Sequence, residues 1–112
     1  MSERSRLRLA AMAALMTAAA LGLVAAAPAT PSVTIDNFTF NPNPIVVAPG
    51  EQVVWTNGDD VPHTVRAEDG SFRSKPMDTG DSYAFTFTKP GIYTYFCSIH
   101  PKMVGKVIVR AP

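Results

Sequence analysis

The chain has 112 residues, which is enough for one domain. Its 10 basic and 9 acidic side chains give a net charge of +1, so it has no basic stripe of the kind that nucleic-acid binding requires. It has one cysteine, which excludes an internal disulfide, and two histidines.

Residues 1–29 have the pattern of a secretory signal peptide. Three arginines among the first eight residues precede an apolar run from Leu9 to Val24, and small residues then offer a cleavage point. We predict a Sec-type signal cut after Ala29, with residues 30–112 as a periplasmic or otherwise exported domain. An uncleaved anchor stays open as an alternative, because the apolar run approaches the roughly 20 residues of a membrane span.

Removal of the leader takes away three basic residues and one acidic residue, which leaves seven basic and eight acidic residues. We expect the resulting domain to be close to neutral, monomeric and not inserted in a membrane. Small exported domains often rely on disulfides. A lone thiol in such a domain therefore indicates either a reactive group or a bound ligand.

The first expected strand region of this domain is SVTIDNFTF, residues 32–40. Alternation puts Val33 and Ile35 on one face of the strand. If the alternation shifts by one residue after Ile35, Phe38 and Phe40 lie on the same face. We expect these four side chains to face the core.

The following segments also combine β-branched and aromatic residues with turn signals at their ends. In chain order the further expected strands are PIVVA (44–48), EQVVW (51–55), SYAFTFT (82–88), IYTYFC (92–97) and MVGKVIV (103–109). The stretch 66–81 lacks strand character. Short, regularly spaced strands without a helical period predict an all-β fold, an antiparallel β-sandwich.

Four residues of this domain carry candidate metal ligands: His63, Cys97, His100 and Met103. Cys97 ends an expected strand, in which alternation puts Tyr95 and Cys97 on one face. A tight loop can return His100 to the same point, and Met103 begins the last strand. A thiolate, two imidazoles and a thioether are soft to borderline ligands. A trigonal His₂Cys set with a weak axial Met is associated with electron-transfer copper.

Other metal groups fit this set less well. Structural zinc requires four Cys or His ligands and only three exist, and attached haem requires a Cys-x-x-Cys-His sequence that is absent. Taken singly, each candidate is more often a packing residue, as we expect for Met77. Taken together, the only cysteine and both histidines fall where one metal ion would need them.

The run from VVWTNGDDVPHTV through GIYTYFCSIHPKMVGKVIV resembles the cupredoxins, the type 1 blue copper proteins. Within that family it is most similar to the amicyanin/plastocyanin-like branch, and its short Cys-x-x-His-x-x-Met loop resembles that of the amicyanins. Ile99 stands where this branch usually has proline. The resemblance implies a Greek-key antiparallel β-sandwich of about eight strands. It also implies one copper ion, cycling between Cu(I) and Cu(II), at one end of that sandwich.

The resemblance further implies a one-electron carrier rather than an enzyme. His63, Cys97 and His100 would be the strong ligands and Met103 the weak axial one. His63 should lie in the interior. His100 should lie near the surface, where a redox donor and acceptor would dock. A periplasmic copper carrier or storage protein is the alternative.

The sulfur of Cys97 is expected to accept hydrogen bonds from two backbone groups. The Thr64 N–H, next to His63, is the expected first donor, and the Ile99 N–H, two residues after the cysteine, is the second. Such hydrogen bonds tune a metal site. The Ile99 side chain could either form part of a docking patch or face the core.

Overall fold

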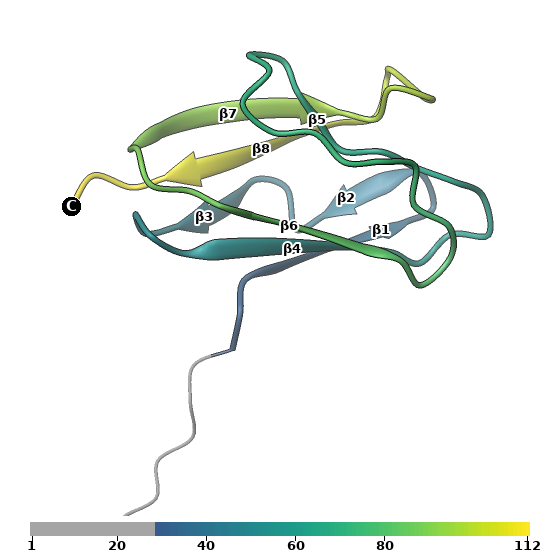
Figure 1. The fold of residues 1–112 in the computed structure, drawn as a ribbon, viewed down its shortest axis with the longest axis horizontal. Coiled ribbons are helices and arrows are strands. Elements are labelled where there is room, and N and C mark those ends of the chain that lie inside the picture. Colours follow the sequence, from purple (N-terminus) through teal and green to yellow (C-terminus); the bar gives the residue numbers. More distant parts are fainter. Residues whose placement is uncertain (1–28) are drawn as a thin grey trace, which may run out of the picture.

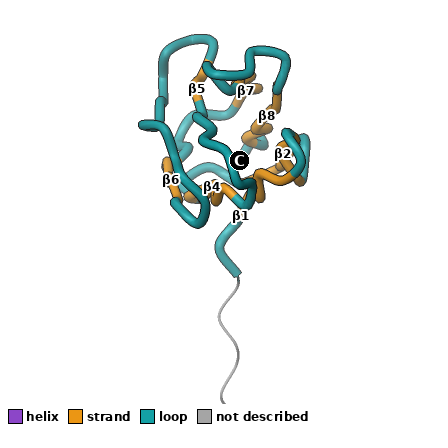
Figure 2. Tube along the Cα trace, turned by 90° about the vertical axis from the view of Figure 1, so that its right-hand side faces the viewer, coloured by secondary structure: helices purple, strands orange, loops and turns teal. Residues whose placement is uncertain are grey.

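The computed structural model describes residues 29–112, which form eight strands in two facing sheets (Figure 1). The view turned by 90° shows the two layers end-on (Figure 2). The predicted leader lies almost entirely outside the described residues. Within them, no helix is long and apolar enough to cross a membrane.

Each sheet has four strands. The first has the order β2-β1-β4-β6, and its strands are β1 (Ser32–Asp36), β2 (Thr39–Asn41), β4 (Gln52–Asn57) and β6 (Ser82–Thr86). The second has the order β3-β8-β7-β5, and its strands are β3 (Ile45–Val47), β5 (Arg66–Ala67), β7 (Gly91–Phe96) and β8 (Val104–Val109). The expected sandwich of about eight strands is confirmed.

Two pairings in this sandwich are parallel, β1 with β4 and β3 with β8, and the other four are antiparallel. The sheets are therefore mixed, whereas the sequence predicted only antiparallel pairing. Between β1 and β4 the chain crosses to the second sheet, where it forms β3. Because of this crossing, β4 can return beside β1 and run in the same direction as β1. The period-2 pattern of burial is the same for both kinds of neighbour, so the sequence could not distinguish them.

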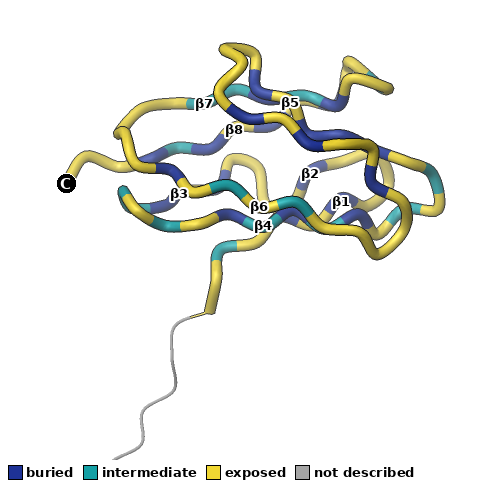
Figure 3. Tube along the Cα trace, viewed as in Figure 1, coloured by how far each residue is buried: buried dark blue, intermediate teal, exposed yellow. Residues whose placement is uncertain are grey.

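The core lies between the sheets, where the buried positions of the two layers face each other (Figure 3). Trp55 of β4 is at its centre and fully buried. Its ring stacks on Phe72 at 5.7 Å and meets the Tyr95 ring edge-on at 5.5 Å. Phe87 belongs to the same core, and Tyr83 and Phe85 are partly buried and pack against it.

Phe38 departs from the predicted inward face. The segment 32–40 divides into β1 and β2 at a turn whose two residues, Asn37 and Phe38, have φ values of 50° and 57°. Phe40 is buried as expected, but Phe38 is 48% exposed. The prediction for Phe38 is wrong because a hairpin loop, not a one-residue slip, interrupts the alternation.

The stretch 66–81 holds more strand structure than its sequence indicated. Arg66–Ala67 form the short strand β5 on the edge of the second sheet, and Arg66 also makes an isolated bridge with Arg73. Two residues are too few to show a period, so the sequence carried no signal for this strand.

Candidate metal centre

The loop between β7 and β8 carries Cys97, His100 and Met103. Cys97 directly follows β7 and is fully buried, on the same face as Tyr95, as alternation predicted. The Cys97 N–H donates to the Met103 carbonyl at 3.1 Å, and the Met103 N–H donates to the His100 carbonyl at 2.9 Å. These bonds close a tight loop that returns His100 to the cysteine.

The other histidine comes from a separate segment of the chain. His63 is fully buried and forms an isolated β-bridge with Met77. The His63 N–H donates to the Met77 carbonyl at 3.2 Å, and the Met77 N–H donates to the His63 carbonyl at 2.8 Å. Met77 is itself buried, which confirms its expected role as a packing residue.

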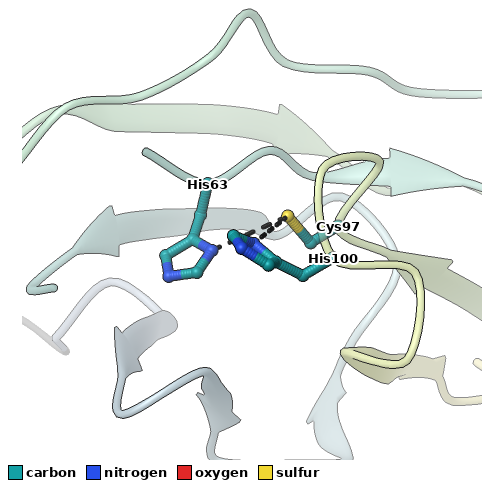
Figure 4. A group of neighbouring side chains, drawn as sticks. All are labelled: His63, Cys97 and His100. Carbon is teal, nitrogen blue, oxygen red and sulfur yellow. Dashed lines mark hydrogen bonds between the residues drawn. The ribbon is translucent and has the colours of Figure 1, made fainter. Parts of the chain in front are cut away.

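Three of the four predicted ligands converge on one point (Figure 4). The Cys97 Sγ lies 3.7 Å from the Nδ1 of His63 and 3.9 Å from the Nδ1 of His100. One potential ligand atom from each of the three residues lies within 4.8 Å of the others. Met103 is buried beside them, and its backbone is bonded to Cys97 and His100.

These separations suit a first-row metal ion. Metal–nitrogen bonds of about 2.0–2.1 Å and a metal–sulfur bond of about 2.3 Å, at trigonal to tetrahedral angles, hold nitrogen and sulfur about 3.6–3.8 Å apart. The distances of the Cys97 Sγ from the two Nδ1 atoms lie in or close to this range. One thiolate, two imidazoles and a neighbouring thioether are the donors that copper prefers.

The surroundings of the sulfur favour the thiolate, which is the metal-binding form. Burial alone would raise the pKa of Cys97. Hydrogen bonds from the Thr64 N–H, His63 and His100 overcome this and lower the pKa to about 6. The thiol can therefore lose its proton to solvent near neutral pH, which leaves a thiolate that can bind a metal ion.

The predicted first donor to the sulfur is confirmed. The Thr64 N–H lies 3.4 Å from the Cys97 Sγ, and the Thr64 hydroxyl adds a contact at 3.7 Å. The predicted second donor is wrong, since among the described residues Ile99 makes no hydrogen bond to this atom. The backbone N–H of His100 lowers the pKa of Cys97 instead. Ile99 faces outward and is 47% exposed, which excludes the core-facing alternative.

Thr64 also joins the two segments that carry the ligands. The Ser98 N–H donates to the Thr64 Oγ1 at 2.7 Å, and the two hydroxyl oxygens lie 2.8 Å apart. The side-chain role of Thr64 and the role of Ser98 were missed in the sequence. Their positions directly after His63 and Cys97 were the only available signal.

Two further neighbours of the histidines were also missed. The Asp59 Oδ2 lies 2.8 Å from the Nε2 of His63, and the Phe38 ring meets the rings of His63 and His100 edge-on at 5.2 and 5.0 Å. The spacing of four residues between Asp59 and His63 could have suggested the first contact. The hydrophobic pattern pointed Phe38 to the wrong side.

Comparison with known proteins supports the same kind of site. Residues 29–110 match the family described as copper binding proteins, plastocyanin/azurin family. An amicyanin of Paracoccus versutus is 40% identical over 83 residues, which are 70% of this chain and 63% of the relative. The chain thus spans less than two thirds of that relative's length. The amicyanin-alpha of Methylorubrum extorquens is 35% identical over 103 residues, which are 87% of each chain.

A solved structure has the same fold. The structure of an oxidised amicyanin variant superposes with a TM-score of 0.70 at 30% sequence identity, and the match covers 76% of this chain and 86% of that one.

Proposed function

The chain belongs to the plastocyanin/azurin family of copper binding proteins, and we propose that it is an exported one-electron carrier with a type 1 copper centre. The observation that carries this proposal is the convergence of the His63 and His100 Nδ1 atoms on the Cys97 sulfur at 3.7 and 3.9 Å. Bound copper would supply the change between Cu(I) and Cu(II).

The residues have distinct roles in this proposal. His63, Cys97 and His100 are the strong ligands, and the thioether of Met103 is the weak axial one. Four ligands leave no open position for a substrate, which favours a carrier over an enzyme. The buried Cys97 and His63 are held by backbone bonds on both sides of the site, so this chain can keep one ligand geometry through a change of charge.

The surface around His100 is the proposed electron port. His100 is partly exposed at the end of the sandwich, and Phe38, Ile99 and Pro101 line an apolar hollow beside it. Phe38 and Ile99 are each about half exposed, which a folded domain tolerates where a partner covers them. A redox donor and an acceptor would dock here in turn.

The cellular setting forms part of the same proposal. The pattern of residues 1–29 indicates export, and residues 30–112 would act in the periplasm as a monomer. Periplasmic conditions suit a buried single thiol that a metal ion protects from oxidation.

The experiment is to add Cu(II) to the purified metal-free protein and to follow its visible absorption. The proposal predicts an intense blue complex at one copper per chain, because the thiolate of Cys97 donates charge to Cu(II). Reduction should bleach the colour and oxidation should restore it. A copper carrier or storage protein would hold Cu(I) without that cycle, and a zinc module would remain colourless.

A further inference from the structure

The carboxylate of Asp59 accepts three hydrogen bonds from two different parts of the site. Its Oδ2 lies 2.8 Å from the Nε2 of His63 and accepts the Phe38 N–H at 3.0 Å. Its Oδ1 accepts the Asn37 N–H at 2.6 Å. Its own backbone is held by the buried Asn57, whose Oδ1 accepts the Asp59 N–H. One side chain thus connects the buried histidine to the turn between β1 and β2.

The contact between Asp59 and His63 determines the orientation of the imidazole ring. The two carboxylate oxygens of Asp59 are contacted by the N–H groups of Asn37 and Phe38 and by the Nε2 of His63, so the carboxylate has a fixed position beside the imidazole. When the Nδ1 of His63 binds a metal ion, the ring proton of the neutral imidazole lies on Nε2, where the Asp59 carboxylate accepts it. The Nδ1 of His63 faces the Cys97 sulfur at 3.7 Å, and the contact with Asp59 fixes the ring in that orientation.

The contacts to Asn37 and Phe38 hold a turn of unusual composition. Positive φ at both residues of a two-residue hairpin loop is the requirement of a type I′ turn, for which Asn-Gly is the preferred pair. Here Phe38 occupies the second position, where a bulky side chain is strained. The sequence thus keeps an aromatic ring where backbone preference favours glycine.

The turn places that ring over the site. The Phe38 ring meets the imidazoles of His63 and His100 edge-on at 5.2 and 5.0 Å, with interplanar angles of 87° and 88°. Edge-to-face aromatic contacts are favourable at these separations. The ring therefore restrains the partly exposed His100 and limits the access of water and chelators to the ligand atoms.

We infer that Asp59 is a positioning residue with two simultaneous tasks: it orients the buried ligand His63, and it holds Phe38 as a cover over His63 and His100. This inference rests on the proposed copper site. It assigns the stability of the bound metal partly to two residues that do not contact it.

The first test compares Asp59→Asn with Asp60→Asn. Asp60 is exposed, and its carboxylate makes no hydrogen bond within the described residues, so the second variant repeats the charge change alone. We expect Asp59→Asn to weaken Cu(II) binding about 10–100-fold, measured by competition with a chelator. Asp60→Asn should leave the affinity unchanged. Asp59→Glu should recover part of it.

The same variants are compared without metal by amide hydrogen exchange. Asp59→Asn should speed the exchange of the Asn37 and Phe38 N–H groups by about 10–100-fold, since it removes a charged acceptor. In Asp60→Asn these two amides should exchange as in the wild type. This readout is independent of copper.

The second test removes the cover and leaves Asp59 in place. Phe38→Gly gives the turn its preferred residue, so the melting temperature of the metal-free protein should stay equal or rise. Copper removal by a chelator should nevertheless be about tenfold faster, as expected from the loss of two aromatic contacts. Phe38→Leu, which keeps an apolar side chain, should fall between Phe38→Gly and the wild type.

The inference is overturned if Asp59→Asn behaves like Asp60→Asn in copper affinity or in exchange, or if Phe38→Gly releases copper at the wild-type rate. A wild-type protein that forms no blue complex would overturn the proposed function, and the inference with it. A blue wild type with no difference between the two aspartate variants would overturn the inference alone.

Discussion

Gly105 is a position where one methyl group should disturb the centre of the sandwich. It is the direct partner of Tyr95 in the β7–β8 pairing. A Cβ added at Gly105 would lie 2.5 Å from both the Cζ and the hydroxyl oxygen of Tyr95. Tyr95 is fully buried, with Phe40 at 4.7 Å and Trp55 at 5.5 Å between ring centroids, so its ring has little room to move.

Two opposing effects determine the outcome of Gly105→Ala. Loss of unfolded-chain entropy would stabilise the variant by about 0.4–1 kcal/mol, because the strand conformation of Gly105 suits alanine. Overpacking of a filled core costs about 1–3 kcal/mol. Because the contact is this short and the ring is enclosed, overpacking should outweigh the gain in entropy. We expect a net loss of about 1–2 kcal/mol in the free energy of unfolding.

The assay is urea and thermal unfolding of the metal-free protein, where this loss corresponds to a melting temperature lower by about 5–15 °C. Tyr95→Leu removes the ring that the new methyl group meets. Adding Gly105→Ala to Tyr95→Leu should therefore cost nothing further, and the double-mutant cycle should show a coupling of about 1 kcal/mol or more. A Gly105→Ala protein as stable as the wild type, or additive effects of the two changes, would refute the reasoning.

Three other predictions follow from named contacts. The hydroxyl of Tyr95 is buried with no hydrogen-bond partner among the described residues, so Tyr95→Phe should leave the free energy of unfolding unchanged or raise it by up to about 1 kcal/mol, measured by urea denaturation. Burial raises the pKa of Tyr95 to about 12. Because the unfolded chain loses this proton near pH 10 and the folded protein does not, the free energy of unfolding should fall as the pH rises, by about 1.4 kcal/mol at pH 11. The same pH series on Tyr95→Phe should lack this part of the loss, and identical curves would contradict the assignment. Cys97→Ser should abolish the blue absorption of the copper protein, whereas Met103→Gln should keep it and lower the reduction potential by favouring Cu(II); strong blue colour in the serine variant would refute the ligand assignment.

The sequence predicted those parts of the molecule that depend on local patterns. Alternation placed Tyr95 and Cys97 on one face of a strand, and the spacing from Cys97 to Met103 predicted the loop that returns His100. These features need only the geometry of one strand and one short turn. They were sufficient to identify the residues that converge.

The remainder depends on contacts between segments far apart in the chain. The pattern assigned Phe38 to the core, because nothing local marks the carboxylate of Asp59, 21 residues later, which accepts the Phe38 N–H. The direction in which Ile99 and its N–H point depends on how the loop turns, and in the structure His100 contributes the backbone donor instead. The parallel pairing of β1 with β4 likewise depends on the path between the sheets.

The central claim, that this domain carries one electron at a time on a single copper ion, is tested most directly by voltammetry of the copper-loaded protein. One chain with one copper should give a reversible one-electron wave, and the blue absorption should return in full after each cycle. The zinc-loaded protein should give no wave. Loss of copper on reduction, or an irreversible wave, would contradict the account and favour a copper carrier or storage protein.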